Sequence, residues 1–308
     1  MKFDVVKSIT IKASMNEVRN LVEDFKHWNS WSPWTVLEPS CPVNIEGSAN
    51  EPGHSMSWDG DIIGSGKNTL ESTNAEKLNY HLEFFKPWKS QAKVEFTFAE
   101  LEDQTKVTWS LDSDMPFFMF FMIKTMKNMI GMDYDRGLKM LKEVAENGTV
   151  KAKTENNGMV DYQGFSFVGI QRTVSYENMA TIMQQDFEKM VNDIVINGKK
   201  GAQHWVCIYP KFNTRNMEVT YIAAVSDEDL ADVQLDSSYT RGRIADTKML
   251  EIKHEGAYEF LGNAWTMGMM YLRAKKIKGK KYPFEQYWNN PADVKPEELL
   301  TSVYFPVK

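Results

Sequence analysis

Apolar and polar residues alternate along several segments of the first half of the chain, beginning with Phe3 to Ile11. In three later segments the apolar residues share one parity: Leu78, Tyr80, Leu82 and Phe84; Val94, Phe96 and Phe98; and Val107, Trp109 and Leu111. Strict alternation places one apolar and one mostly polar face on each strand. The pattern predicts an antiparallel sheet that is covered on one side.

After Pro116 the apolar residues recur at helical spacing. The apolar positions of this stretch are Ile123, Met126, Ile130, Tyr134, Leu138, Leu141 and Val144. Their spacing predicts a long amphipathic helix that covers the apolar face of the sheet. A shorter helix is predicted after Ser14, which forms a capping box with Glu17.

Three tryptophans follow this short helix in the segment "HWNSWSPW", residues 27–34. Pro33 disfavours one continuous helix, so the rings are expected to point in different directions. We expect Trp28 and Trp31 to close one end of the sheet-and-helix layer by packing against the long helix. Trp34 is expected to lead into the next strand.

A polar segment, "AENGTVKAKTENNG", lacks apolar periodicity and contains two glycines. Such composition is typical of a linker. We therefore predict two domains of an α+β protein, residues 1–146 and residues 158–308, joined by a linker at 147–157.

The second half repeats an order of elements. One or two strands precede a helix from about Glu177 to Ile196, and two strands follow it. A long strand region then leads to a second helix and a last strand, "TSVYFPV". The order predicts two related strand-helix-strand units that share one antiparallel sheet.

Composition excludes some classes of function. Residues 1–150 carry 16 lysines and arginines against 22 aspartates and glutamates, and the rest of the chain is balanced. This is not the basic footprint of a nucleic-acid-binding protein, so direct nucleic-acid binding is not expected. The longest apolar run, "MPFFMFFMI", is too short to span a membrane, and no signal peptide is visible. We expect a cytoplasmic protein.

Motifs for catalysis or cofactors are scarce. The chain has no nucleophile elbow, zinc-protease motif, phosphate-binding loop or dinucleotide fingerprint. Its two cysteines are far apart, and its five histidines lie at no metal-binding spacing from one another. We therefore expect neither a metal site nor a cofactor.

The first half resembles the polyketide-cyclase-like branch of the START/Bet v 1 (SRPBCC) superfamily. The resemblance rests on "IKASMNEV", "DFKHWNSWSPW", the glycine pattern that follows Trp58, "TKVTWSLD" and "GLKMLKEV". It implies a helix-grip fold with an apolar cavity between sheet and helix. It does not imply one chemistry.

The second half resembles the GyrI-like family, also called the bacterial transcription-activator effector-binding domain. The resemblance rests on "FVGIQRTVS", "HEGAYEFLGNAW", "FEQYWNNP" and "LLTSVYFPV". In this family the acid of the E-x-Y motif, here Glu285, projects into a central pocket. The resemblance implies that Glu285 attracts cationic or polarised ligands, and in a subset of the family that acid serves hydrolysis.

Aromatic residues of both halves are further candidates for ligand contact. In the second half they are Tyr258, Trp265, Tyr221 and Tyr287, beside Glu285; in the first half they are Trp58, Tyr80, Trp109, Trp28 and Trp31. Core packing is an equally good explanation for Trp265 and the better one for Tyr221. In a helix-grip fold the core and the cavity wall are the same surface.

We expect a two-pocket protein without a DNA-binding domain that senses or sequesters a small apolar compound, cationic or neutral. The first alternative is a hydrolase of a reactive small molecule with Glu285 as acid and base. The second is a transcription-related regulator that acts through a protein partner.

Overall fold

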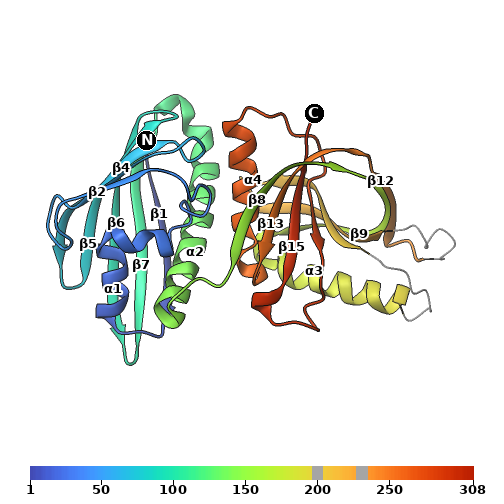
Figure 1. Ribbon diagram of the computed structural model, residues 1–308, viewed down its shortest axis with the longest axis horizontal. Helices are drawn as coiled ribbons and strands as arrows, with labels where there is room; N and C mark the ends of the chain where they lie inside the picture. Colours follow the sequence, from blue (N-terminus) through green and yellow to red (C-terminus); the bar gives the residue numbers. More distant parts are fainter. Residues whose placement is uncertain (196–203, 227–234) are drawn as a thin grey trace. The chain divides into compact units, whose positions relative to one another are not determined.

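The computed structural model describes residues 1–195, 204–226 and 235–308. The chain divides into two compact units, Met1–Lys151 (unit 1) and Ala152–Lys308 (unit 2). Figure 1 shows a sheet and helices in each unit. No helix among the described residues has the length and apolarity needed to cross a membrane.

Unit 1 is one antiparallel sheet with two α-helices. In chain order its elements are β1 (Lys2–Ile11), α1 (Met15–Glu23), η1 (Phe25–Ser30), β2 (Val43–Glu46), β3 (Ser55–Asp59), β4 (Ser65–Asn74), β5 (Lys77–Lys86), β6 (Ser90–Leu101), β7 (Gln104–Asp114), η2 (Phe117–Met122) and α2 (Ile123–Asn147). The strand order is β1-β7-β6-β5-β4-β3-β2. The predicted helix-grip architecture is confirmed.

Local sequence explains where the helices of unit 1 begin and pack. The Ser14 hydroxyl accepts a hydrogen bond from the Glu17 amide, and the Glu17 carboxylate accepts one from the Ser14 amide, so the predicted capping box forms. The α2 helix lies close to the sheet at Gly137, where a Cβ atom would come within 2.9 Å of the Trp109 ring. One turn earlier, Tyr134 stacks on Trp109 with ring centroids 3.8 Å apart.

Unit 2 is one antiparallel eight-stranded sheet with two α-helices. Its elements are β8 (Lys153–Tyr162), β9 (Phe165–Ser175), α3 (Tyr176–Met190), η3 (Val191–Val195), β10 (Trp205–Asn213), β11 (Glu218–Ser226), β12 (Tyr239–Ile244), β13 (Thr247–Glu255), η4 (Tyr258–Phe260), α4 (Gly262–Ala274), β14 (Phe284–Tyr287), η5 (Pro296–Glu298) and β15 (Leu300–Pro306). The strand order is β12-β9-β11-β10-β14-β15-β13-β8.

The predicted internal repeat is visible in this strand order. The series β9-α3-β10-β11 and β13-α4-β14-β15 occupy mirrored places in the sheet, so β10 and β14 lie side by side at its centre. Each repeat therefore contributes one strand to the middle of unit 2. Two strands follow each helix, whereas the sequence predicted two after the first helix and one after the second.

Two boundaries differ from the sequence prediction. The connection between α2 and β8 spans only residues 148–152, because residues 153–157 of the predicted linker belong to β8, which pairs with β13. Polar residues suit β8 because it is an edge strand with one sheet neighbour, and for the same reason it lacks the apolar periodicity that predicts a strand. The predicted helix from Glu177 begins one residue earlier and becomes a π-helical turn at Val191; Ile196 lies outside the described residues.

Candidate ligand-binding site around Glu285

Glu285 lies at the centre of the unit 2 sheet. It is the second residue of β14, where it pairs with Cys207 of β10 on one side and Val303 of β15 on the other. Neighbouring residues of a strand point to opposite faces, so Phe284 and Gln286 face away from Glu285. The carboxylate is only 4% exposed.

Three aromatic side chains from three elements donate hydrogen bonds to this carboxylate. The Tyr209 hydroxyl of β10 lies 2.9 Å from Oε2, and the Tyr287 hydroxyl of β14 lies 2.5 Å from the same atom. The indole Nε1 of Trp265, on α4, lies 2.5 Å from Oε1. Both oxygens of the carboxylate are therefore engaged by neutral donors.

Burial dominates the electrostatics of the site. Loss of water around the carboxylate raises the pKa of Glu285, and the hydrogen bonds from Tyr287, Trp265 and Tyr209 oppose that rise. Burial also raises the pKa of the Tyr209 and Tyr287 hydroxyls and of the Cys207 thiol well above their usual values. The phenols and the thiol consequently stay protonated and neutral at physiological pH.

Further aromatic rings surround the three donors and extend to the surface of unit 2. Tyr258 meets the Tyr287 ring edge-on at 5.6 Å, and Phe187 of α3 meets it at 5.8 Å. Phe212 stacks on Tyr209 with centroids 5.5 Å apart. Tyr258 is 39% exposed and Phe212 is 41% exposed, so the aromatic shell reaches the surface of unit 2 on both repeats.

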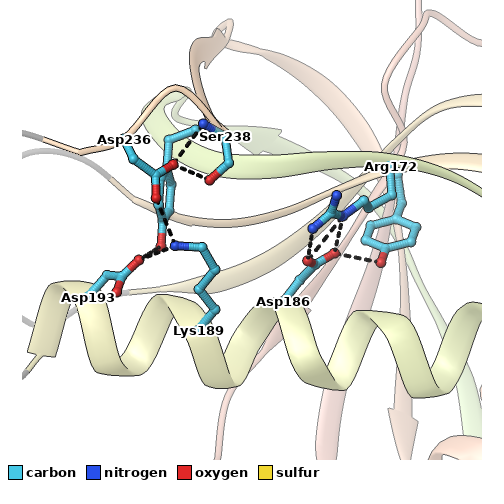
Figure 2. Close-up of polar contacts among 8 residues, drawn as sticks. Arg172, Asp186, Lys189, Asp193, Asp236 and Ser238 are labelled. Carbon is cyan, nitrogen blue, oxygen red and sulfur yellow. Dashed lines mark hydrogen bonds and ion pairs between the residues drawn. The ribbon is translucent and has the colours of Figure 1, made fainter.

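The structure thus brings together four residues that the sequence selected in this half: Glu285, Tyr287, Trp265 and Tyr258. The fifth, Tyr221, belongs to a different polar cluster. Its hydroxyl donates to Asp186 of α3 at 2.8 Å, and Arg172 of β9 binds the same carboxylate at 3.0 Å (Figure 2). Tyr221 therefore joins α3 to the sheet instead of contacting Glu285.

A second group of polar contacts holds the C-terminal part of α3. Lys189 contacts Asp193 at 2.5 Å and Asp236 at 3.0 Å, and the Tyr239 hydroxyl donates to Asp193 at 2.8 Å (Figure 2). The α3 helix, which supplies Phe187 to the aromatic shell, is thus attached to its neighbours at two points along its length.

The candidate residues of unit 1 mostly pack against one another. Trp28, Trp31, Tyr80 and Trp109 are buried, and ring contacts link Trp28 to the other three at 4.8 to 6.4 Å. Trp58 lies apart from them and contacts Phe84.

Hydrogen bonds explain why the tryptophans follow α1. The Trp28 indole and the Tyr80 hydroxyl both donate to the carbonyl of Val22, and the Trp31 indole donates to that of Leu21. These carbonyls lie in the last turn of α1, where no helical donor remains. The cluster therefore completes the end of a helix as well as filling the core.

The three tryptophans differ in their ring contacts. Of the three tryptophans it is Trp34 that makes a ring contact with the long helix, at 6.4 Å from Tyr134, whereas Trp28 and Trp31 contact the sheet through Trp109 and Phe96. The next strand after Trp34 begins only at Val43. The η1 turn that carries Trp28 also contacts α2, so the packing of Trp28 and Trp31 against the long helix stays a prediction.

Sequence reasoning missed three members of the site: Tyr209, Cys207 and Phe187. Tyr209 and Cys207 share a parity in "HWVCIYP", which was a usable signal for one common face. The sequence does not indicate that β10 pairs with β14. This pairing places Cys207 beside Glu285, which is 78 positions later in the chain. Within the described ranges, no group of three or more histidines, cysteines or acids is arranged to hold a metal ion.

Family models match both units. Residues 2–146 match the model described as polyketide cyclase / dehydrase and lipid transport, and residues 159–308 match the GyrI-like small molecule binding domain. The chain therefore consists of a domain of the first family followed by a domain of the GyrI-like family. Both resemblances seen in the sequence are confirmed.

The solved structures that the chain resembles are distant in sequence. The C-terminal domain of EcmrR is 17% identical, over 51% of this chain and 98% of that one, with a TM-score of 0.38. The integron cassette protein VCH_CASS2 of Vibrio cholerae is 15% identical, over 50% and 99%, with a TM-score of 0.37. The Aha1 dimer of Colwellia psychrerythraea is 18% identical, over 47% and 98%, with a TM-score of 0.36. No curated protein matches the chain.

Proposed function

We propose that unit 2 binds an apolar organic cation at Glu285 and that the protein senses or sequesters such a compound. The observation that carries the proposal is the carboxylate buried inside a shell of aromatic rings. A carboxylate supplies the countercharge for a cation, and the faces of Trp and Tyr rings attract cations directly. Apolar sites with a few fixed polar groups are the usual form of small-molecule sites.

The donors of Glu285 fit this role. Three neutral groups hold the carboxylate in place without cancelling its charge, so a bound cation finds a preorganised anion. The exposed edges of Tyr258 and Phe212 mark where a ligand enters the aromatic shell.

We place the ligand in unit 2 rather than unit 1 because the two interiors differ. The rings of unit 1 donate to backbone carbonyls of α1 and contact one another, and the buried acid near Tyr80, Glu23, is already paired with Arg19 at 2.7 Å.

Hydrolysis is the alternative, since burial raises the pKa of Glu285 as general acid–base chemistry requires. The engagement of both carboxylate oxygens by fixed donors favours binding, because a general base needs an oxygen directed at a water molecule.

Calorimetric titration with benzyltrimethylammonium and with its neutral isostere neopentylbenzene tests the proposal. We expect the cation to bind more tightly than the isostere, and Glu285→Gln to weaken cation binding by about tenfold or more while leaving the isostere unaffected. A preference for the isostere, or equal cation affinity in Glu285→Gln, contradicts the proposal.

Glu251→Gln is the matched control. Glu251 is the other buried glutamate of the unit 2 sheet, it accepts hydrogen bonds from Ser302 and Tyr304, and its strand position faces away from the helices. Loss of cation binding in this variant as well would show that Glu285 acts through stability and not through contact. Turnover of an electrophilic ester that Glu285→Gln abolishes would favour the hydrolase.

A further inference from the structure

Four phenylalanines of unit 1 lie on the surface in one short segment. Phe117 and Phe118 are 76% and 74% exposed, and Phe120 and Phe121 are 57% and 55% exposed. All four belong to η2, the turn that joins β7 to α2. Phenylalanine is normally buried, and a contiguous exposed apolar patch marks an interaction surface.

A second exposed aromatic loop lies at the same end of the sheet. The hairpin between β5 and β6 carries Phe85 and Trp88, which are 46% and 54% exposed. The antiparallel register places the start of β6 beside the end of β7, with Ala92 opposite Ser113. Both loops therefore emerge at the end of unit 1 where β1 begins, marked N in Figure 1.

The charges of these two segments differ from those of the rest of unit 1. Acids outnumber cations in residues 1–150, yet residues 84–94 and 115–132 contain no aspartate or glutamate and five lysines: Lys86, Lys89, Lys93, Lys124 and Lys127. Lys86 pairs with Asp59 and Lys127 with Asp4, while Lys89 and Lys124 are exposed beside the rings. Exposed aromatic rings flanked by lysines thus lie at this end of unit 1, beside the exposed Asp112 and Asp114 at the end of β7.

We propose that this end of unit 1 docks on an anionic lipid membrane. Aromatic rings partition into the headgroup region of a bilayer, and lysines near the surface gain from negatively charged lipids. The chemistry favours lipid over a second copy of the chain, because a symmetric dimer through this surface would set the lysines of one copy against those of the other. The rings insert at the interface and do not span the bilayer.

Co-sedimentation of the full-length protein with vesicles tests the docking. The wild type pellets with vesicles of phosphatidylcholine and phosphatidylserine, and less with phosphatidylcholine alone or at high salt. The double variant Phe117→Ser/Phe118→Ser loses at least about tenfold in partitioning, because two rings no longer enter the interface. Lys89→Glu/Lys124→Glu loses the preference for phosphatidylserine and keeps the weaker binding to phosphatidylcholine.

Leu101→Ser is the matched control. Leu101 is 47% exposed at the hairpin between β6 and β7, the opposite end of the sheet, so this variant keeps wild-type partitioning. The proposal is overturned if the wild type stays in the supernatant, or if the double phenylalanine variant pellets equally well. It is also overturned if that variant only converts a dimer into a monomer in sedimentation velocity, which would assign the surface to a second copy. Unchanged circular dichroism of each variant shows that folding is preserved.

Discussion

Both units bury tryptophan and tyrosine side chains with polar atoms, yet the acceptors of those atoms differ. In unit 1, Trp28, Trp31 and Tyr80 donate to backbone carbonyls at the end of α1. In unit 2, Tyr209, Trp265 and Tyr287 donate to the carboxylate of Glu285. A backbone carbonyl cannot change its charge, whereas a carboxylate titrates and attracts cations. The same residue types therefore stabilise a fold in one unit and hold a responsive group in the other.

The largest expected effect is on the stability of unit 1. Trp31→Ala removes ring contacts with Trp28, Phe96 and Trp109 and leaves a cavity in a fully buried position. We expect the unfolding of unit 1 to become easier by about 3–5 kcal/mol, measured by urea denaturation of the full chain. Cation binding by unit 2 should not change, and a loss of binding would show that the two aromatic groups are not independent.

The second largest expected effect is a dependence of cation affinity on pH. Since burial raises the pKa of Glu285 above the ordinary value of 4.5, the carboxylate is still protonated in a range where an exposed one is ionised. A cation prefers the ionised form, so its affinity should rise with pH through the raised pKa, by about tenfold per pH unit at most. Calorimetry at a series of pH values measures this slope, which should vanish in Glu285→Gln. An affinity that falls with rising pH would contradict the proposal that the ionised carboxylate of Glu285 binds the cation.

The smallest effects come from removing one hydroxyl in each unit. Tyr80→Phe should destabilise unit 1 by about 1 kcal/mol with no dependence on pH near neutrality, because only one hydrogen bond to the Val22 carbonyl is lost. Tyr287→Phe removes a hydrogen bond that lowers the pKa of Glu285, so cation affinity should fall at neutral pH and recover at higher pH. Identical pH behaviour of the two variants would remove the distinction between the units.

Much of the fold was predictable because it depends on local patterns. Parity of Val107, Trp109 and Leu111 identified a strand face, and the spacing around Tyr134 identified α2. The family motif identified Glu285 as the central acid. Its aromatic neighbours Tyr287 and Trp265 were predicted because they lie in motifs of the same family.

Other features depend on contacts between distant residues and could not be predicted. The pairing of Cys207 with Glu285 brings Tyr209 to the carboxylate, and Asp186 draws the Tyr221 hydroxyl to α3. The polar strand β8 is specified by its neighbour β13, since Lys153 to Asn157 carry no apolar signal of their own. In each of these cases a contact between residues distant in the sequence determines the local structure.

Cys207, the partner of Glu285 across the central strands, is also a native reporter of how often the site opens. Its thiol is fully buried and its pKa is raised, so a maleimide reacts with it only after the surrounding structure separates. In a chain whose other cysteine, Cys41, is replaced by serine, the labelling rate then measures the frequency of that separation. A bound ligand that holds β10, α3 and α4 together would slow the labelling, and the ratio of the two rates is a kinetic measure of occupancy that needs no dye attached to the ligand.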